Sequence, residues 1–301
     1  MSCQITSSQN PKIKWLLQLQ QKSSARREEG LFVVEGQREL MHCVRNGYHV
    51  HTIFFCPEIV QADSQPGLQR SNADVDAYAL LDQADTLYEV SSKVYEKIAY
   101  RCGTEGVIAV VRTRELTLSQ LQEGLQTAGT KARVGESPAP FYVVLEGVEK
   151  PGNLGAILRS ADAAAADAVI ICDPRTDLYN PNLIRSSIGA VFTVPCVTCS
   201  SAECIAFLKR NGIQILTAQL QDSLPYYSTD MRRATAIVMG TEATGLTQPW
   251  REAADAHIRI PMCGMLDSLN VSVSTAILMF EVVRQRSADT LHGFPSSAES
   301  S

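Results

Sequence analysis

The chain has 301 residues, a length that favours two domains of roughly 150 residues each. Hydrophobic residues make up 45% and charged residues 20%, which excludes wholesale disorder and collagen-like or disulfide-scaffold proteins. The net charge of −5 argues against a nonspecific nucleic-acid coat, because such binding depends on basic residues that neutralise phosphates. No apolar run is long enough for a transmembrane helix, and the first residues lack the apolar core of a secretory signal. We therefore expect a cytoplasmic protein without a membrane segment.

Basic residues gather near the amino terminus. Residues 10–27 contain five of them and no acidic residue, so this segment carries +5 and the rest of the chain about −10. The five are Lys12, Lys14, Lys22, Arg26 and Arg27. The ordinary explanation of such a run is a solvated helix face, and the alternative is a short arm that binds RNA phosphates.

The nine cysteines are odd in number and scattered, which predicts reduced thiols in a chain large enough to bury its own core. Cys196 and Cys199 form the one C-x-x-C pair. No second pair and no neighbouring histidine completes a tetrahedral zinc set, so we expect no bound metal.

The first part of the chain predicts a small α/β domain. Residues 10–22 place apolar side chains at helical spacing after a proline, and residues 37–46 predict a second helix that ends at Gly47. Short β-type runs occupy residues 31–34, 51–56 and 107–111. The small residues and prolines between positions 127 and 140 are typical of a linker.

The second part shows a regular alternation of apolar strands and helices, which predicts a parallel sheet covered on both faces. The predicted strands are residues 141–145, 168–172, 190–195, 213–217, 235–240 and 256–261. We expect Asn153 to cap a helix at 154–166, and Asn180 with Pro181 to begin another. A last helix at 272–286 precedes a polar tail that should be disordered.

These patterns divide the chain into four parts. The expected boundaries are residues 1–115 for the first domain, 116–140 for the linker, 141–286 for the second domain and 287–301 for the disordered tail.

The loop at residues 240–246 (GTEATGL) follows a predicted strand and carries two glycines at the spacing of a phosphate loop. Leu246 replaces the lysine of such a loop, and the carboxylate of Glu242 would repel a phosphate. A cationic or neutral ligand such as the sulfonium of S-adenosylmethionine fits this charge better. Glycines that merely turn the chain are the alternative.

Three segments together resemble the three motifs of the SpoU family of RNA ribose 2'-O-methyltransferases. They are residues 153–159 (NLGAILR), 240–246 (GTEATGL) and 260–272, which begin IPM and end SLNVS. Intermediate family features at residues 180–181 and 185–190 extend the resemblance over about residues 141–286. The amino-terminal half is similar to the substrate-binding domain of the family at residues 5–14 and 32–36.

The resemblance implies an α/β fold with two parts. The carboxy-terminal domain would be a SPOUT α/β-knot domain, with a parallel sheet and a trefoil knot. It would follow a small α/β substrate-binding domain of the L30e type. Knots are disfavoured by chain physics, so neither composition nor periodicity indicates one. Members of the family form homodimers.

The resemblance also implies which residues form the site. Those implied to hold S-adenosylmethionine are Gly240, Gly245, Ile260, Met262, Leu269 and Ser272. Those implied to act in catalysis are Asn153, Arg159, Glu242, Ser268 and Asn270. Without the resemblance, Ile260 and Leu269 would be interpreted as core residues, Arg159 as part of a surface salt bridge, and the hydroxyl and amide groups as helix caps.

The implied reaction moves a methyl group from sulfur to a ribose 2'-hydroxyl by in-line displacement, without a metal. No histidine lies in the three motifs, and arginine keeps its proton in almost all proteins. We therefore expect Arg159 to clamp a neighbouring phosphate and stabilise the developing alkoxide, while the phosphate or a water accepts the proton. Deprotonation assisted by Arg159 is the alternative.

Ribosomal RNA is the favoured substrate, because some 110 amino-terminal residues could dock on a structured RNA with the five basic side chains of residues 10–27. A transfer-RNA methyltransferase is the alternative. A noncatalytic RNA-binding protein that retains the fold and a small-molecule methyltransferase are the hypotheses of other classes.

Overall fold

The computed structural model describes residues 3–63, 77–100, 105–123, 139–241 and 244–288. The chain forms two compact units. Unit 1 consists of Met1–Glu115 with Thr176–Thr193, and unit 2 of Leu116–Arg175 with Val194–Ser301. Most of the predicted linker and nearly all of the predicted disordered tail lie outside the described residues, so the four domain boundaries stay predictions.

Unit 1 contains a five-stranded mixed sheet with the strand order β1-β4-β3-β5-β2. Strands β1, β4 and β3 are parallel to one another, whereas β5 is antiparallel to both β3 and β2. The strands are β1 (Cys3–Ile5), β2 (Leu31–Glu35), β3 (Val50–Phe55), β4 (Ala84–Val90) and β5 (Val107–Arg112). The predicted strands near β2, β3 and β5 are confirmed. The sequence does not predict β1, which has only three residues, or β4, whose apolar pattern is interrupted by polar residues.

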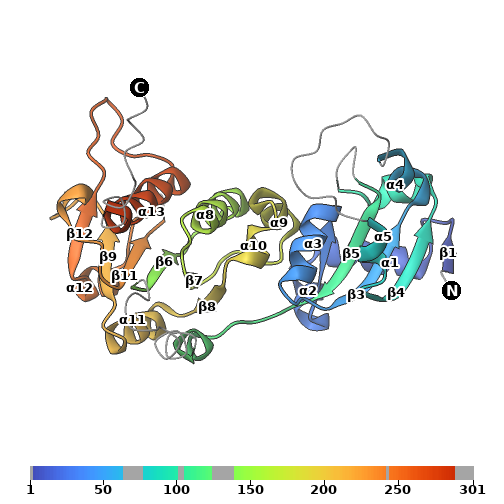
Figure 1. The fold of residues 1–301 in the computed structure, drawn as a ribbon, viewed down its shortest axis with the longest axis horizontal. Helices are drawn as coiled ribbons and strands as arrows, with labels where there is room; N and C mark the ends of the chain where they lie inside the picture. Colours follow the sequence, from blue (N-terminus) through green and yellow to red (C-terminus); the bar gives the residue numbers. More distant parts are fainter. Residues whose placement is uncertain (1–2, 64–76, 101–104, 124–138, 242–243, 289–301) are drawn as a thin grey trace, which may run out of the picture. The chain divides into compact units, whose positions relative to one another are not determined.

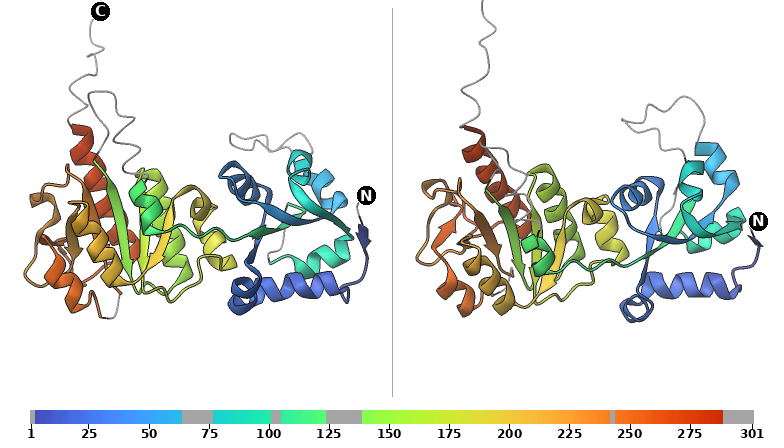
Figure 2. Two further views of the ribbon diagram at one scale, coloured as in Figure 1. Left: turned by 90° about the horizontal axis from the view of Figure 1, so that it is seen from below. Right: turned by 60° about the horizontal axis from the view of Figure 1, so that its bottom comes forward.

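Helices cover both faces of this sheet (Figure 2). Helices α1 and α6 pack on one face, and α3 packs against β2. The helices of unit 1 are α1 (Pro11–Gln21), α2 (Ser23–Glu29), α3 (Gln37–Arg45), α4 (Pro57–Asp63), α5 (Ala77–Leu81), α6 (Ser92–Ile98), α9 (Pro181–Ser187) and α10 (Ala190–Thr193). The predicted helices at 10–22 and 37–46 are confirmed as α1 and α3.

Helix α1 forms where the sequence predicts it, for identifiable local reasons. The Asn10 side chain accepts a hydrogen bond from the backbone N–H of Lys12 at 2.9 Å, and Pro11 occupies the first turn. Ile13, Leu16 and Leu19 are fully buried on the inner face. The lysines of the helix consequently lie on its outer side.

Unit 2 contains a seven-stranded sheet in which every pair is parallel, with the order β10-β12-β9-β11-β6-β7-β8. This confirms the predicted parallel sheet. The strands are β6 (Phe141–Glu146), β7 (Ala168–Cys172), β8 (Cys196–Cys199), β9 (Gln214–Ala218), β10 (Leu224–Pro225), β11 (Thr235–Met239) and β12 (Ala256–Arg259). Strands β6, β7 and β11 are buried along their whole length, as expected for strands covered on both faces.

Figure 1 shows α8 and α13 on one side of this sheet and α11 and α12 on the other. The labelled helices of unit 2 are α8 (Pro151–Ala163), α11 (Ser201–Arg210), α12 (Gln248–Ala253) and α13 (Val271–Ala288), with a 3₁₀ turn at Tyr226–Ser228, and residues 118–123 are also helical. Phe207 and Trp250 from α11 and α12 are fully buried against Tyr142 and Ile170 of the sheet. Helix α13 packs against α8, so the last helix of the unit lies beside the helix that follows β6.

The predicted strand at residues 190–195 is wrong. The structure forms helix α10 from Ala190 to Thr193, and the strand begins only at Cys196. A short apolar run does not distinguish a buried strand from a buried helical turn. Here Ile188 and Gly189 adopt left-handed conformations that end α9, and the chain then makes one further helical turn. The predicted start of α9 is confirmed, since Asn180 caps it and Pro181 occupies its first turn.

No helix among the described residues combines the length and apolar character needed to cross a membrane. The structure gives the strand order of unit 2 and the packing of α13 against α8. The trefoil knot stays a prediction.

Candidate active site

A cleft of about 720 Å³ lies in unit 2, where strands β9, β11 and β12 end. Its walls come from residues 218–221, 239–241, 244–246, 258–260 and 267–271, together with Arg251, Met262, Ser274 and Leu278. The volume suits a small-molecule site, and the carboxyl ends of parallel strands are where such sheets bind ligands. These features are typical of enzymes that hold a nucleotide-sized cofactor.

Gly240 is required where β11 ends, because the following loop folds back onto it. Thr241 and Gly245 exchange backbone hydrogen bonds of 3.3 and 3.0 Å. A Cβ at position 240 would lie 2.3 Å from the carbonyl carbon of Gly245 and 2.6 Å from the backbone nitrogen of Leu246. Those neighbours are backbone atoms, so a side chain at position 240 would displace the loop.

The structure brings most of the sequence-predicted cofactor residues to the cleft. The predicted residues that line it are Gly240, Gly245, Ile260, Met262, Ser268, Leu269 and Asn270. Ser272 is not a lining residue. Its backbone N–H and hydroxyl donate to the Asn270 side-chain oxygen at 3.0 and 2.6 Å. Glu242 lies outside the described residues.

Asn270 links the cleft wall to helix α8. Its Nδ2 donates to Oδ1 of Asn153 at 3.1 Å, while its own Oδ1 accepts from Ser272. The expectation that Asn153 caps the helix is wrong, because α8 begins at Pro151 with Lys150 in the cap position. Asn153 therefore lies inside the first turn, and its side chain joins Asn270 across the two motifs.

Arg159 lies six residues farther along α8 and is exposed to solvent. It is not among the residues that line the cleft. At 100° per residue it stands about 240° around the helix from Asn153, so the two side chains leave different faces. The first motif thus contributes one side chain that contacts the cleft wall and one that is open to a large substrate.

Glu146 supports the cofactor loop and was not identified from the sequence. It ends β6 and is only 6% exposed. Its carboxylate accepts hydrogen bonds from the Thr247 backbone N–H at 2.9 Å, from the Thr247 hydroxyl at 2.6 Å and from the Ser201 hydroxyl at 3.3 Å. The signal for it was an acidic residue directly after the apolar run at 141–145.

Two buried polar atoms of lining residues have no partner among the described protein atoms. They are Oε1 of Gln219, an acceptor, and Nε of Arg251, a donor. Buried polar groups are normally hydrogen-bonded, so unpartnered atoms beside a cleft indicate a ligand or ordered water. Leu246, Ile258 and Leu278 provide an apolar wall of the same cleft. S-adenosylmethionine, with its apolar adenine face and polar amino-acid end, fits this mixture.

The five basic residues of the segment 10–27 divide into two groups. Lys12, Lys14, Lys22 and Arg27 are exposed, and the Lys12 ammonium lies 5.6 Å from the centre of the Trp15 ring. Arg26 is only 3% exposed.

The expectation that Arg26 contacts RNA is wrong in this structure. Its guanidinium bonds Asp177 at 2.7 Å and donates to the carbonyl of Leu19 at 2.6 Å. To contact Arg26, a phosphate would have to break a buried ion pair. Breaking a buried pair costs more free energy than breaking an exposed one.

Comparisons with known proteins agree with this geometry. The model of the SpoU rRNA Methylase family matches residues 140–280, and a model of the MRM3-like substrate binding domain matches residues 10–109. The chain is 35% identical over 224 residues to the 23S rRNA (guanosine-2'-O-)-methyltransferase RlmB of Bordetella pertussis, which covers 73% of this chain and 88% of that protein. The protein of the same name from Yersinia pestis is 35% identical over 214 residues, or 69% and 82% of the two chains.

Solved structures show the same likeness over nearly the whole chain. The crystal structure of an RNA 2'-O ribose methyltransferase is 36% identical, with a TM-score of 0.73 over 94% of this chain and 99% of that one. An AdoMet-bound rRNA methyltransferase from Sinorhizobium meliloti is 27% identical, with a TM-score of 0.76 over 93% and 97%. The chain therefore belongs to the SpoU rRNA methylase family. It is an RNA methyltransferase that uses S-adenosylmethionine as the methyl donor.

Proposed function

We propose that this enzyme methylates the ribose 2'-hydroxyl of a guanosine in 23S ribosomal RNA, and that it does so in the cytoplasm. The observation that carries the proposal is the hydrogen bond between Asn270 and Asn153, which joins the cofactor cleft to the helix that presents Arg159. The relatives named for 23S rRNA support the substrate.

S-adenosylmethionine would be held by the loops that line the cleft. Backbone groups around Gly240 and Gly245 can approach it closely, and Ile260, Met262 and Leu269 can pack against the adenine. When bound, it supplies a methyl group on a sulfonium, which is a good leaving group for in-line displacement. The unpartnered donor of Arg251 adds a polar contact for its charged end.

The chemical step forms a bond between the 2'-oxygen and the methyl carbon, breaks the bond between that carbon and sulfur, and releases the hydroxyl proton. Ser268 and Asn270 would orient the ribose at the cleft. Arg159 would bind the adjacent phosphate and stabilise the negative charge that develops on the 2'-oxygen. Its exposed position on α8 leaves it open to RNA.

Homodimer formation is part of the proposal. Large apolar side chains are exposed both in the segment beside the cleft, at Met265 and Leu266, and on α13, at Val273 and Phe280. Exposed apolar surface of this kind marks interaction surfaces. Light scattering of the purified chain tests this: a dimer is expected, and a monomer at micromolar concentration would contradict it.

Unit 1 would bind the RNA. The exposed side chains of Lys12, Lys14, Lys22 and Arg27 provide a basic surface for phosphates, without the buried Arg26. The match of residues 10–109 to a substrate-binding domain supports this role.

The test is methyl transfer from labelled S-adenosylmethionine to unmodified 23S rRNA, with transfer RNA and an RNA-free reaction as comparisons. We expect label at a single 2'-position of 23S rRNA. Preferential labelling of transfer RNA would favour the alternative substrate. Cofactor binding without label in any RNA would indicate a noncatalytic RNA-binding protein.

A further inference from the structure

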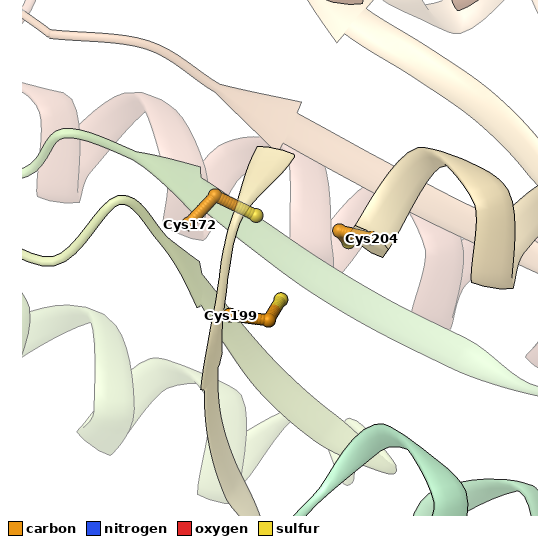
Figure 3. Close-up of side chains that lie close together, drawn as sticks. All are labelled: Cys172, Cys199 and Cys204. Carbon is orange, nitrogen blue, oxygen red and sulfur yellow. The ribbon is translucent and has the colours of Figure 1, made fainter. Parts of the chain in front are cut away.

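Three cysteines from separate elements meet at the edge of unit 2. Cys172 is the last residue of β7, Cys199 is the last residue of β8, and Cys204 lies in the first turns of α11. Figure 3 shows their side chains turned toward one another. The three sulfur atoms lie within 4.8 Å of one another, and this is the one such group of potential metal ligands in the part of the chain that the structure describes.

Strand geometry explains why this set differs from the C-x-x-C pair in the sequence. Side chains alternate between the faces of a strand, so Cys196 and Cys199, three residues apart in β8, lie on opposite faces. Cys199 pairs in register with Cys172 of the neighbouring strand, which places both on the same face. Cys199 therefore has as its neighbour on this face Cys172, which is 27 residues away in the sequence, and not Cys196 of the C-x-x-C pair.

The turn after β8 adds the third sulfur. Ser200 and Glu203 form a capping box, in which the Ser200 hydroxyl accepts from the Glu203 backbone and the Glu203 carboxylate accepts from the Ser200 backbone. This box starts α11 directly after the strand and brings Cys204 back over the sheet. Cys204 and Cys172 are fully buried, whereas Cys199 is partly exposed.

The surroundings suit a soft cation. Ile170 and Phe207 belong to the apolar core that encloses two of the sulfurs, so few hard oxygen ligands compete with sulfur there. Small apolar side chains would fill this space equally well, so three converging sulfurs are more than packing requires.

We propose that Cys172, Cys199 and Cys204 bind one Zn²⁺ ion as thiolates, with water as the fourth ligand on the exposed side of Cys199. Three S–H bonds break, three Zn–S bonds form, and the three protons pass to solvent, which leaves a complex of charge −1. Zn–S bonds of about 2.3 Å in a tetrahedral site place the sulfurs about 3.8 Å apart, so each pair closes by about 1 Å at most.

The ion would have a structural role for the cofactor loop. Ser201 lies between the two ligands Cys199 and Cys204, and the one hydrogen of its hydroxyl is shared between Asp173 at 2.6 Å and Glu146 at 3.3 Å. Glu146 in turn holds Thr247 at the end of the cofactor loop. Fixing the turn between β8 and α11 would therefore stabilise the support of that loop, at a distance from the reacting atoms.

The experiment uses the full chain, reduced with a phosphine, stripped of metal and then titrated with Zn²⁺ or with Co²⁺ as a coloured probe. We expect one equivalent of Zn²⁺ retained after gel filtration, and a thiolate-to-cobalt charge-transfer band with the intensity of three thiolates. C199A and C204A should weaken Zn²⁺ binding by at least about tenfold, and C196A should not. Alanine at these positions avoids burying a hydroxyl.

Three results would overturn the proposal. One is no retained Zn²⁺ on the wild-type chain with its thiols shown to be reduced. Another is loss of binding in C196A equal to that in C199A. The last is a disulfide among the three cysteines of the freshly purified protein that resists reduction by the phosphine and prevents Zn²⁺ binding. Circular dichroism of each variant identifies any that fails to fold, and the wild-type titration decides the proposal without them.

Discussion

The carboxyl edge of the seven-stranded sheet carries two different environments. Strands β9, β11 and β12 end in an open cleft lined by loop residues, whereas β7 and β8 end in a closed group of cysteines. The cleft is built from contiguous motifs, so its residues can be recognised in the sequence. The cysteine group exists only because strand register and a helix cap bring distant residues together.

Hydrogen bonding separates the two environments further. The cleft leaves Oε1 of Gln219 and Nε of Arg251 without partners among the described protein atoms. Beside the cysteines, Asp173 accepts from the Ser201 hydroxyl at 2.6 Å, and Trp250 donates to the same hydroxyl at 3.0 Å. The polar groups beside the cysteines are therefore hydrogen-bonded within the protein, whereas polar atoms that lack a described protein partner occur beside the cleft.

The largest expected effect on binding or stability is at Gly240. Gly240→Ala places a methyl group against backbone atoms of the loop, so we expect S-adenosylmethionine affinity to fall by about 100-fold in calorimetry, or about 3 kcal/mol. Gly264→Ala is the matched control, since a Cβ there meets nothing within 4 Å. Equal affinities for the two variants would show that the cleft does not depend on the close approach at Gly240.

A smaller effect is expected at Glu146. Glu146→Gln puts an amide N–H₂ among groups that donate hydrogen bonds, and we expect the unfolding free energy to fall by about 2 kcal/mol. Glu252→Gln, on the exposed side of α12, should change it little. Chemical denaturation of both variants measures the difference, and matching midpoints would remove Glu146 from the support of the cofactor loop.

The smallest effect concerns RNA affinity. Replacing Lys12 and Lys14 together by alanine should weaken rRNA binding and lower the slope of log K against log salt by about 1 for each phosphate that a lysine no longer neutralises. Lys209→Ala, on the exposed end of α11, is the control. Filter binding at several salt concentrations gives the slope, and a slope equal to that of the control would mean that the amino-terminal lysines do not bind phosphate.

Local rules predicted the elements whose causes are local. The Asn10 cap with Pro11 fixed α1, and the apolar runs of β6, β7, β9, β11 and β12 were recognised as strands. Residues 190–195 failed because the left-handed residues Ile188 and Gly189 set the following turn, which no apolar pattern reveals. The cap predicted at Asn153 failed because Pro151 begins the helix one turn earlier than the apolar spacing indicates.

Contacts between distant residues could not be predicted. The basic run at 10–27 gives no sign that Arg26 turns inward to Asp177, 151 positions away. Nothing local links Glu146 to Thr247, or Cys172 to Cys199 and Cys204. The motif residues of the cleft were named because the family resemblance supplied their grouping, and the structure then placed seven of them along the cleft.

The most direct test of the proposed function is the turnover of Arg159→Ala beside Arg210→Ala, which removes an exposed arginine of α11. We predict that Arg159→Ala binds S-adenosylmethionine as tightly as the wild-type chain, while kcat for 23S rRNA methylation falls by about 100-fold to 1000-fold. Arg210→Ala should retain the wild-type kcat. Unchanged kcat in a folded Arg159→Ala protein would contradict the proposed role of this arginine.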